Sequence, residues 1–118
     1  MVEVSKAVGP WREAVRAETQ RMGCEPLAGP VAVRVDFYMP RPKGHWRTGR
    51  NADLLRESAP RLPDGRPDVD KLSRAVLDGL TEGGAWKDDG QVVHLDAMKL
   101  YAPKGDPGFC RIEVNEFA

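Results

Sequence analysis

The sequence predicts a small α+β domain in which a mixed sheet carries two main helices, and three observations support this fold class. The chain has 118 residues, 41% hydrophobic and 31% charged, which is enough for one compact core and too few for two cores of normal size. Two segments repeat apolar residues with the period of a helix, and three others alternate with the period of a strand. Because the helical segments interrupt a small sheet of mostly hairpin-type neighbours, we expect a single α+β domain over residues 1–118.

The first helix and the first strand are expected within residues 10–39. Pro10 suits the first turn of a helix, and one helical face then carries four apolar residues before Gly23 ends the pattern: Trp11, Ala14, Val15 and Met22. After a break rich in glycine and proline, apolar residues alternate from Val31 to Met39. This alternation predicts a half-buried strand, which Pro40 ends.

A second helix and two further strands are expected between residues 68 and 117. One face of the helix carries Val69, Leu72, Val76 and Leu80. A glycine break over residues 81–84 precedes a strand over residues 91–101, whose apolar residues change phase, so we expect a β-bulge near Ala97. The turn sequence KGDPG then introduces a last strand over residues 109–117.

The segment over residues 40–67 is rich in arginine, glycine and proline and has no sustained apolar period, so it predicts a long, mobile loop. Seven basic residues face three acidic ones between Arg41 and Arg66, whereas seven acidic residues face three basic ones between Asp68 and Asp96. A basic loop therefore leads into an acidic centre. The alternative is that a solvated loop and a solvated helix differ in charge by chance.

Several functional classes are disfavoured. The net charge is zero, which argues against a protein that holds nucleic acid by bulk electrostatics alone. No apolar run approaches the roughly 18 residues that span a bilayer, and no secretory signal opens the chain, so we expect a soluble cytoplasmic protein without a membrane partner. Cys24 and Cys110 lack the spacing of a metal site, so we expect both to be ordinary small apolar residues. His45 and His94 are isolated in sequence.

Paired aspartates flank the second predicted helix. Asp68 and Asp70 lie at its start, and the glycine turn can bring Asp88 and Asp89 back towards them. Two carboxylates about 4 Å apart repel by roughly 4 kcal/mol at an effective dielectric constant near 20, so a cation is needed between them. Carboxylate oxygens without His or thiolate favour Mg²⁺, Mn²⁺ or Ca²⁺ over zinc. In such a site the ion activates water, and phosphodiester hydrolysis is the natural chemistry.

Each of these residues also has a purely structural interpretation. Asp68 or Asp70 can cap a helix, because aspartate is a preferred cap residue. Asp70, Arg74 and Asp78 are spaced four apart and can form an exposed ladder of ion pairs.

The same applies to the residues after the helix. Asp88, Asp89 and Gly90 can form a plain turn. Trp86, next to Lys87, can stack on a base, but an aromatic side chain that anchors a loop to the core is the more common arrangement.

The combined string PDVDKLSRAVLDGLTEGGAWKDDGQVVHLDAMK decides between these interpretations. It closely resembles the signature of the RusA family of Holliday junction resolvases, whose pattern is approximately D-x-D-N-L-x-K-x-x-x-D-x-L, a glycine-aromatic turn and D-D-x-Q-V. The match covers residues 67–99, with looser similarity in the first helix and first strand. The resemblance implies a RusA-like fold and a homodimeric, Mg²⁺-dependent endodeoxyribonuclease, with Mn²⁺ as an acceptable substitute. Such an enzyme nicks four-way DNA symmetrically in recombination and repair, one cut per subunit.

By position, the resemblance makes Asp68, Asp70 and Asp89 the metal-binding catalytic aspartates, with Asp88 as an adjacent acid. Arg74 falls where the family commonly has a catalytic lysine; an arginine keeps the positive charge but cannot give up a proton. Lys71 stands in place of the usual asparagine. Candidate DNA contacts are the basic residues of the loop and of the site: Arg41, Lys43, Arg47, Arg50, Lys71 and Lys87.

The resemblance also implies a strand ahead of the first helix. The chain begins close to that helix, which leaves open whether the family's N-terminal strand is lacking. The substitutions at Lys71 and Arg74 motivate a second hypothesis, a catalytically impaired homologue that binds branched DNA without cutting it. A third, a D-x-D nucleotide-sugar transferase, is disfavoured because such enzymes need a much larger nucleotide-binding domain.

Overall fold

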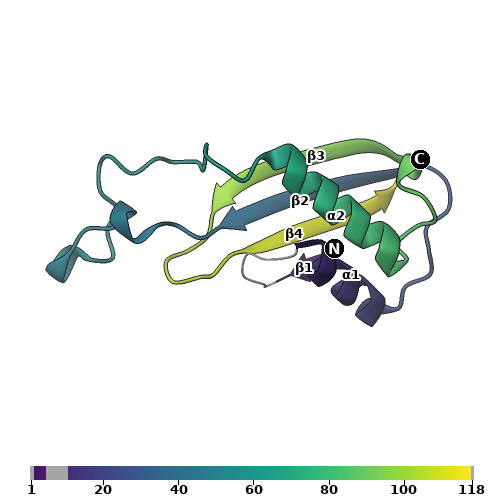
Figure 1. Ribbon diagram of the computed structural model, residues 1–118, viewed down its shortest axis with the longest axis horizontal. Helices are drawn as coiled ribbons and strands as arrows, with labels where there is room; N and C mark the ends of the chain where they lie inside the picture. Colours follow the sequence, from purple (N-terminus) through teal and green to yellow (C-terminus); the bar gives the residue numbers. More distant parts are fainter. Residues whose placement is uncertain (1, 5–10, 118) are drawn as a thin grey trace.

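The computed structural model describes residues 2–4 and 11–117. Figure 1 shows a sheet with the long helices on one of its faces and an arm that extends away from it. The strands and α-helices, in chain order, are β1 (Val2–Val4), α1 (Trp11–Met22), β2 (Val31–Met39), α2 (Val69–Gly83), β3 (Val92–Tyr101) and β4 (Phe109–Glu116). Three short 3₁₀ helices are η1 (Lys43–His45), η2 (Gly49–Asn51) and η3 (Asp89–Gln91). The predicted α+β fold class is confirmed.

The four strands form one mixed sheet in the order β1-β4-β2-β3. Strand β2 is central: it runs parallel to β3 and antiparallel to β4. The expectation of mostly hairpin-type neighbours is therefore wrong, because β3 and β4 follow each other in the chain but lie on opposite sides of β2. Local periodicity predicts strands, but it does not determine which strands pair.

The irregularity in β3 lies at its beginning. Val31 pairs with Val92 and Ala32 pairs with His94, which leaves Val93 as the extra residue of the bulge. From His94 to Tyr101 the pairing is continuous, so the predicted bulge near Ala97 is wrong. Strand β3 is at the edge of the sheet, where apolar side chains such as Val93 are exposed. The alternation of apolar residues along this strand therefore does not show which residues are buried.

A short strand does precede the first helix. Residues Val2–Val4 form β1, which pairs antiparallel with β4 through Val2 and Ile112. The sequence left open whether this strand is lacking, and the structure shows a three-residue edge strand at this position.

Both α-helices pack on the same face of the sheet and share its hydrophobic core. The fully buried side chains include Trp86, Phe37, Leu80 and Ile112. The helices approach each other closely at Gly79, where an added Cβ atom would stand 2.6 Å from the backbone oxygen of Arg12. Trp86 is 1% exposed and donates a hydrogen bond from Nε1 to the Thr81 hydroxyl, which confirms its interpretation as a core anchor.

The arm over residues 40–67 is a long loop, as predicted, and it contains local hydrogen-bonded structure. Its tip is a small hairpin in which Trp46 bridges Leu55, and the amides of Arg47 and Arg56 donate to the carbonyls of Leu54 and His45, both at 2.9 Å. None of residues 40–67 is buried. The arm is therefore held by hydrogen bonds and not by a core of its own.

Two further expectations concern the cysteines and membranes. Cys110 is buried, and burial raises the pKa of its thiol to about 12, so it behaves as a small apolar residue. Cys24 is exposed, so the expectation does not hold for it. Within residues 2–4 and 11–117, none of the helices is long and apolar enough to cross a membrane.

Candidate active site

Asp68 and Asp70 lie at the N-terminal end of α2, and both are exposed. Asp68 occupies the N-cap position with extended backbone, but its side chain makes no capping hydrogen bond to the helix. The structural interpretation of Asp68 as a side-chain cap is therefore not supported. The carboxylate at this position is available for another purpose, and the helix dipole favours a negative charge here.

Asp88 has a clear structural role. It caps η3, and its side chain accepts a hydrogen bond from the amide of Gly90 at 3.0 Å. The Gln91 side chain completes a capping box by accepting from the amides of Lys87 and Asp88 at 3.0 and 3.2 Å. Turn formation thus accounts for Asp88.

Gln91 is a positioning residue that the sequence interpretation missed. Besides closing the capping box, its amide nitrogen donates to the carbonyl oxygens of Leu27 and Gly29 at 3.0 and 2.9 Å. One side chain thus ties the turn that carries Asp89 to the segment between α1 and β2. The signal was present as the Gln of the D-D-x-Q-V element, but a glutamine in a turn has no distinctive pattern of its own.

Arg74 joins α2 to the turn after it. Its Nη1 atom lies 2.7 Å from a carboxylate oxygen of Asp89 and 3.3 Å from one of Asp78. The hydrogen bond from Arg74 lowers the pKa of Asp89, and the same bond raises the pKa of Arg74. Asp89 is therefore held as a carboxylate beside an arginine. Of the predicted ladder of Asp70, Arg74 and Asp78, the ion pair between Arg74 and Asp78 is present, but Asp70 forms no ion pair with Arg74.

The structure brings Asp89 to Arg74 but does not gather the acids into one cluster. Within the described part of the chain, no group of three or more His, Cys, Asp or Glu side chains is placed to hold a metal ion. The Asp89 carboxylate is neutralised by Arg74, one helical turn beyond Asp70. As it stands, a single chain does not fit the three-aspartate metal site that the sequence predicts.

Basic groups lie directly beside the start of α2. An open hollow of about 440 Å³ is lined by Arg66, Pro67, Asp68 and Lys71. Lys99 of β3 braces this corner by donating from Nζ to the backbone carbonyls of Gly65 and Pro67 at 2.6 and 2.9 Å. The corner thus combines a free carboxylate with exposed cations.

The predicted DNA-binding arginines of the arm differ in their surroundings. Arg41 lies over the Tyr101 ring, 3.9 Å from its centroid, and donates to the Pro60 carbonyl at 2.8 Å. Arg47 donates to the Leu55 carbonyl at 3.1 Å. Arg41 and Arg47 therefore help to hold the arm together, while Lys43 and Arg50 are exposed in η1 and η2, and Lys87 is exposed before η3.

Comparison with known families settles the relationship that the motif indicates. The family model of the endodeoxyribonuclease RusA matches residues 2–115, almost the whole chain. The chain belongs to the RusA family. Its D-x-D element, Arg74 and the turn with Asp89 all lie within the residues that the family model matches.

Individual members of the RusA family show the same similarity. The crossover junction endodeoxyribonuclease RusA of Escherichia coli K12 is 32% identical over 79 residues, which cover 67% of this chain and 48% of that protein. The crossover junction endodeoxyribonuclease of Enterobacteria phage 82 matches with the same identity and coverage. The uncharacterized protein YqaN of Bacillus subtilis is 34% identical over 76 residues, 64% of this chain and 52% of YqaN. The matches thus span about half the length of these relatives.

Proposed function

We propose that this chain is an endodeoxyribonuclease that cuts four-way DNA junctions by paired symmetric nicks, in recombination and repair. The observation that carries the proposal is the exposed D-x-D element at the start of α2, in a chain that the RusA family model covers over residues 2–115. The relatives from Escherichia coli and phage 82 are named crossover junction endodeoxyribonucleases. The natural location of such an activity is the cytoplasm, where bacterial and phage DNA recombine.

The basic residues bind the DNA backbone in this proposal. Lys71 and Arg66 flank Asp68 at the open corner, where they can neutralise a phosphate that approaches the carboxylates. Lys43 and Arg50 extend the positive surface along the arm, and Lys87 does so beside the turn. Because phosphate contacts fix position without reading sequence, these residues give affinity and register.

Mg²⁺ is the cation we propose, with Mn²⁺ as a substitute. A Mg²⁺ site usually needs only one or two carboxylates, with water and substrate phosphate completing its shell, so Asp68 and Asp70 are sufficient as protein ligands in number. Bound metal would supply activated water and charge neutralisation. Asp89 is a further candidate ligand, and its ion pair with Arg74 competes with that role.

A second candidate function follows from the same ion pair. If Arg74 still pairs with Asp89 when DNA is bound, Asp89 is not available as a metal ligand. In that case the protein binds branched DNA and does not cut it. Arginine at this position retains the charge of the family's lysine but cannot exchange a proton. A parent protein that shifts a four-way junction on a gel and leaves it uncut with Mg²⁺ or Mn²⁺ would establish this alternative.

The proposed function also includes a homodimer. A four-way junction presents two equivalent strands to be cut, and a two-fold pair of subunits offers one site to each.

The variant Asp70→Asn tests the catalytic assignment. The change removes one carboxylate charge and keeps the shape of the side chain, so we expect loss of cleavage of a synthetic four-way junction with unchanged junction affinity. The matched control is Asp64→Asn, the same change at an exposed aspartate of the arm outside the motif. Cleavage by Asp70→Asn at the parent rate would reject the assignment.

A further inference from the structure

A hollow lies where the arm joins the sheet, and we name it the proline hollow. It has a volume of about 270 Å³, and its walls come from the two segments that enter and leave the arm and from the end of β3. Figure 1 shows the arm leaving the sheet at the end of β2 and returning to the start of α2. Most of the apolar lining consists of ring side chains: Pro40, Pro42, Pro63, Pro67 and Tyr101.

Hydrogen bonds fix the walls of the proline hollow, although the arm has no buried residue. Lys99 of β3 donates from Nζ to the carbonyl oxygens of Gly65 and Pro67, which ties the returning segment to the sheet. Arg41 of the outgoing segment donates to the carbonyl oxygen of Pro60 at 2.8 Å, which ties the two segments to each other. The proline rings also restrict the backbone around the hollow. The hollow is therefore formed before a ligand arrives, as binding pockets usually are.

The proline hollow adjoins the open corner at the start of α2. Arg66 and Pro67 line both the proline hollow and the hollow of about 440 Å³ that also contains Asp68 and Lys71. The proline hollow offers carbon rings, and the corner offers exposed cations. A nucleotide is divided in the same way, since a single sugar separates its planar base from its charged phosphate. A phosphate held at the corner therefore brings a base within reach of the proline hollow.

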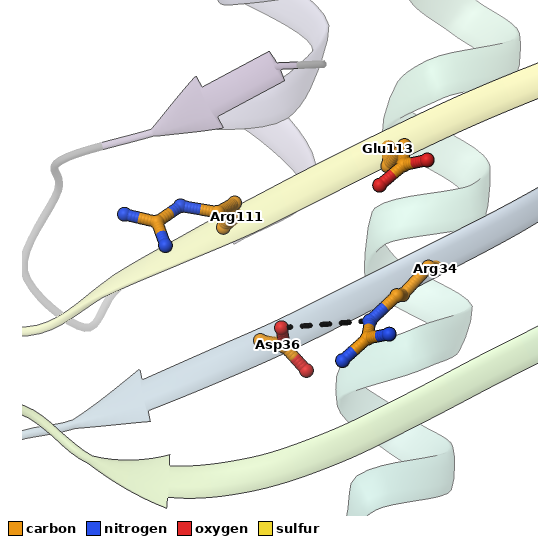
Figure 2. A pocket seen from close by; sticks show the side chains of 4 residues that line it. All are labelled: Arg34, Asp36, Arg111 and Glu113. Carbon is orange, nitrogen blue, oxygen red and sulfur yellow. Dashed lines mark ion pairs between the residues drawn. The ribbon is translucent and has the colours of Figure 1, made fainter.

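Another hollow, on the helix-free face of the sheet, has a different chemistry (Figure 2). It has a volume of about 160 Å³ and is lined by Arg34, Asp36, Arg111 and Glu113. Its two arginines are balanced by two carboxylates, and Arg34 pairs with Asp36 at 3.7 Å. It therefore offers neither excess positive charge for a phosphate nor ring side chains for a base. Of the two hollows, the one at the base of the arm suits a nucleotide.

We propose that the proline hollow binds one unstacked DNA base, beside the phosphate that the corner of Asp68 and Lys71 holds. This inference rests on the proposed function and adds a site for a base next to the cut. Taking a base out of its stack costs least where the stack is already interrupted, and the crossing point of a four-way junction is such a place. Stacking on ring side chains tolerates any base, so the hollow adds affinity and fixes the register of the DNA.

An abasic scan of a four-way junction tests the proposal in EDTA, which separates binding from cleavage. Each junction lacks the base at one position near the crossing point, and fluorescence anisotropy measures its affinity for the purified chain. At one position in each symmetric half, loss of the base should weaken binding at least about fivefold, because the stacking of that base is lost.

The variant Tyr101→Leu links this effect to the proline hollow, because it removes the aromatic ring from the lining. The intact and the abasic junction should then bind within about twofold of each other. Tyr101→Phe keeps the ring and should retain the difference. The matched control is Trp46→Leu, the same kind of change at a position of the arm that does not line the hollow, and it should also retain the difference.

Crosslinking of the unchanged chain replaces this comparison if Tyr101→Leu does not fold, which circular dichroism checks. Iodouracil is placed at the position that the scan identifies, and mass spectrometry locates the crosslink after irradiation. The crosslinked peptide should contain a residue of the proline hollow.

Three results would overturn the proposal: no position at which the base matters, an undiminished base effect in folded Tyr101→Leu, or crosslinks only outside the hollow. A chain that shows the base effect but leaves junctions uncut with Mg²⁺ retains this inference and loses the proposed cleavage. A chain that cuts junctions without a base effect does the reverse, and a chain that binds no junction loses both.

Discussion

Two oppositely charged regions lie next to each other in this chain, and they are held in different ways. The acidic region begins on α2, whose Leu72, Val76 and Leu80 are buried in the core. The basic arm over residues 40–67 has no buried residue and is held by backbone hydrogen bonds and by its own arginines. The difference indicates that the carboxylates are fixed on a rigid element, while the arm can open locally.

Disrupting the support of the acidic region should have the largest effect. Gly79→Ala places a Cβ atom 2.6 Å from the Arg12 carbonyl and 2.9 Å from Cβ of Val15, so α1 and α2 must separate. Overpacking of this kind costs about 1–3 kcal/mol. We expect thermal unfolding to show a melting temperature lower by several degrees.

The matched control for this change is Gly44→Ala in η1 of the arm, where an added Cβ atom meets nothing within 4 Å. Its free energy of unfolding should change by less than about 0.5 kcal/mol. Equal melting temperatures for the two variants would contradict the contrast between core and arm.

Variants of two arginines should distinguish residues that stabilise the arm from residues that bind DNA. Arg41→Ala removes the bond to Pro60 and the contact with the Tyr101 ring, worth together about 1 kcal/mol, so amide exchange in the arm should accelerate several-fold. Arg50→Ala should leave amide exchange unchanged and reduce the salt dependence of DNA affinity by about one phosphate contact.

Hydrogen exchange and junction binding at several salt concentrations measure both effects. If Arg41→Ala leaves exchange in the arm unchanged, its assigned holding role is wrong. If Arg50→Ala leaves the salt dependence unchanged, it does not contact phosphate.

The smallest effect concerns Asp89. Its pKa is lowered from 3.8 by the hydrogen bond from Arg74, so the pair stabilises the fold above that pH, and the contribution is lost as the pH falls through the lowered pKa. Arg74→Gln should therefore raise the pKa of Asp89 towards 3.8. A carbon-13 NMR titration of the aspartate carboxyl groups measures it, and an unchanged pKa would show that the ion pair does not persist in solution.

Much of the fold follows from local sequence patterns. The helix that ends at Met22 and the strand Val31–Met39 are found where periodicity places them, because the buried positions of β2 alternate along the strand. The pairing of β4 with β2 was not predictable in this way, since it depends on contacts between distant segments. The arm's hairpin was also missed, because bonds from guanidinium groups to carbonyls leave no apolar pattern.

The candidate site was predictable to a similar extent. The motif names Asp68, Asp70 and Asp89 as the site, and all three lie within the residues that the family model matches. It did not reveal that Arg74 pairs with Asp89 or that Gln91 holds the turn, because both depend on how the turn after α2 folds back. Whether these aspartates act on DNA remains a prediction.

One measurement tests the central claim most directly. A labelled synthetic four-way junction and a linear duplex of the same sequence are incubated with the purified chain, with Mg²⁺ or with EDTA. The proposed function predicts paired nicks at symmetric positions in the junction with Mg²⁺, none with EDTA, and an intact linear duplex. A junction that stays intact with Mg²⁺ while the protein is folded and bound to it would contradict the claim.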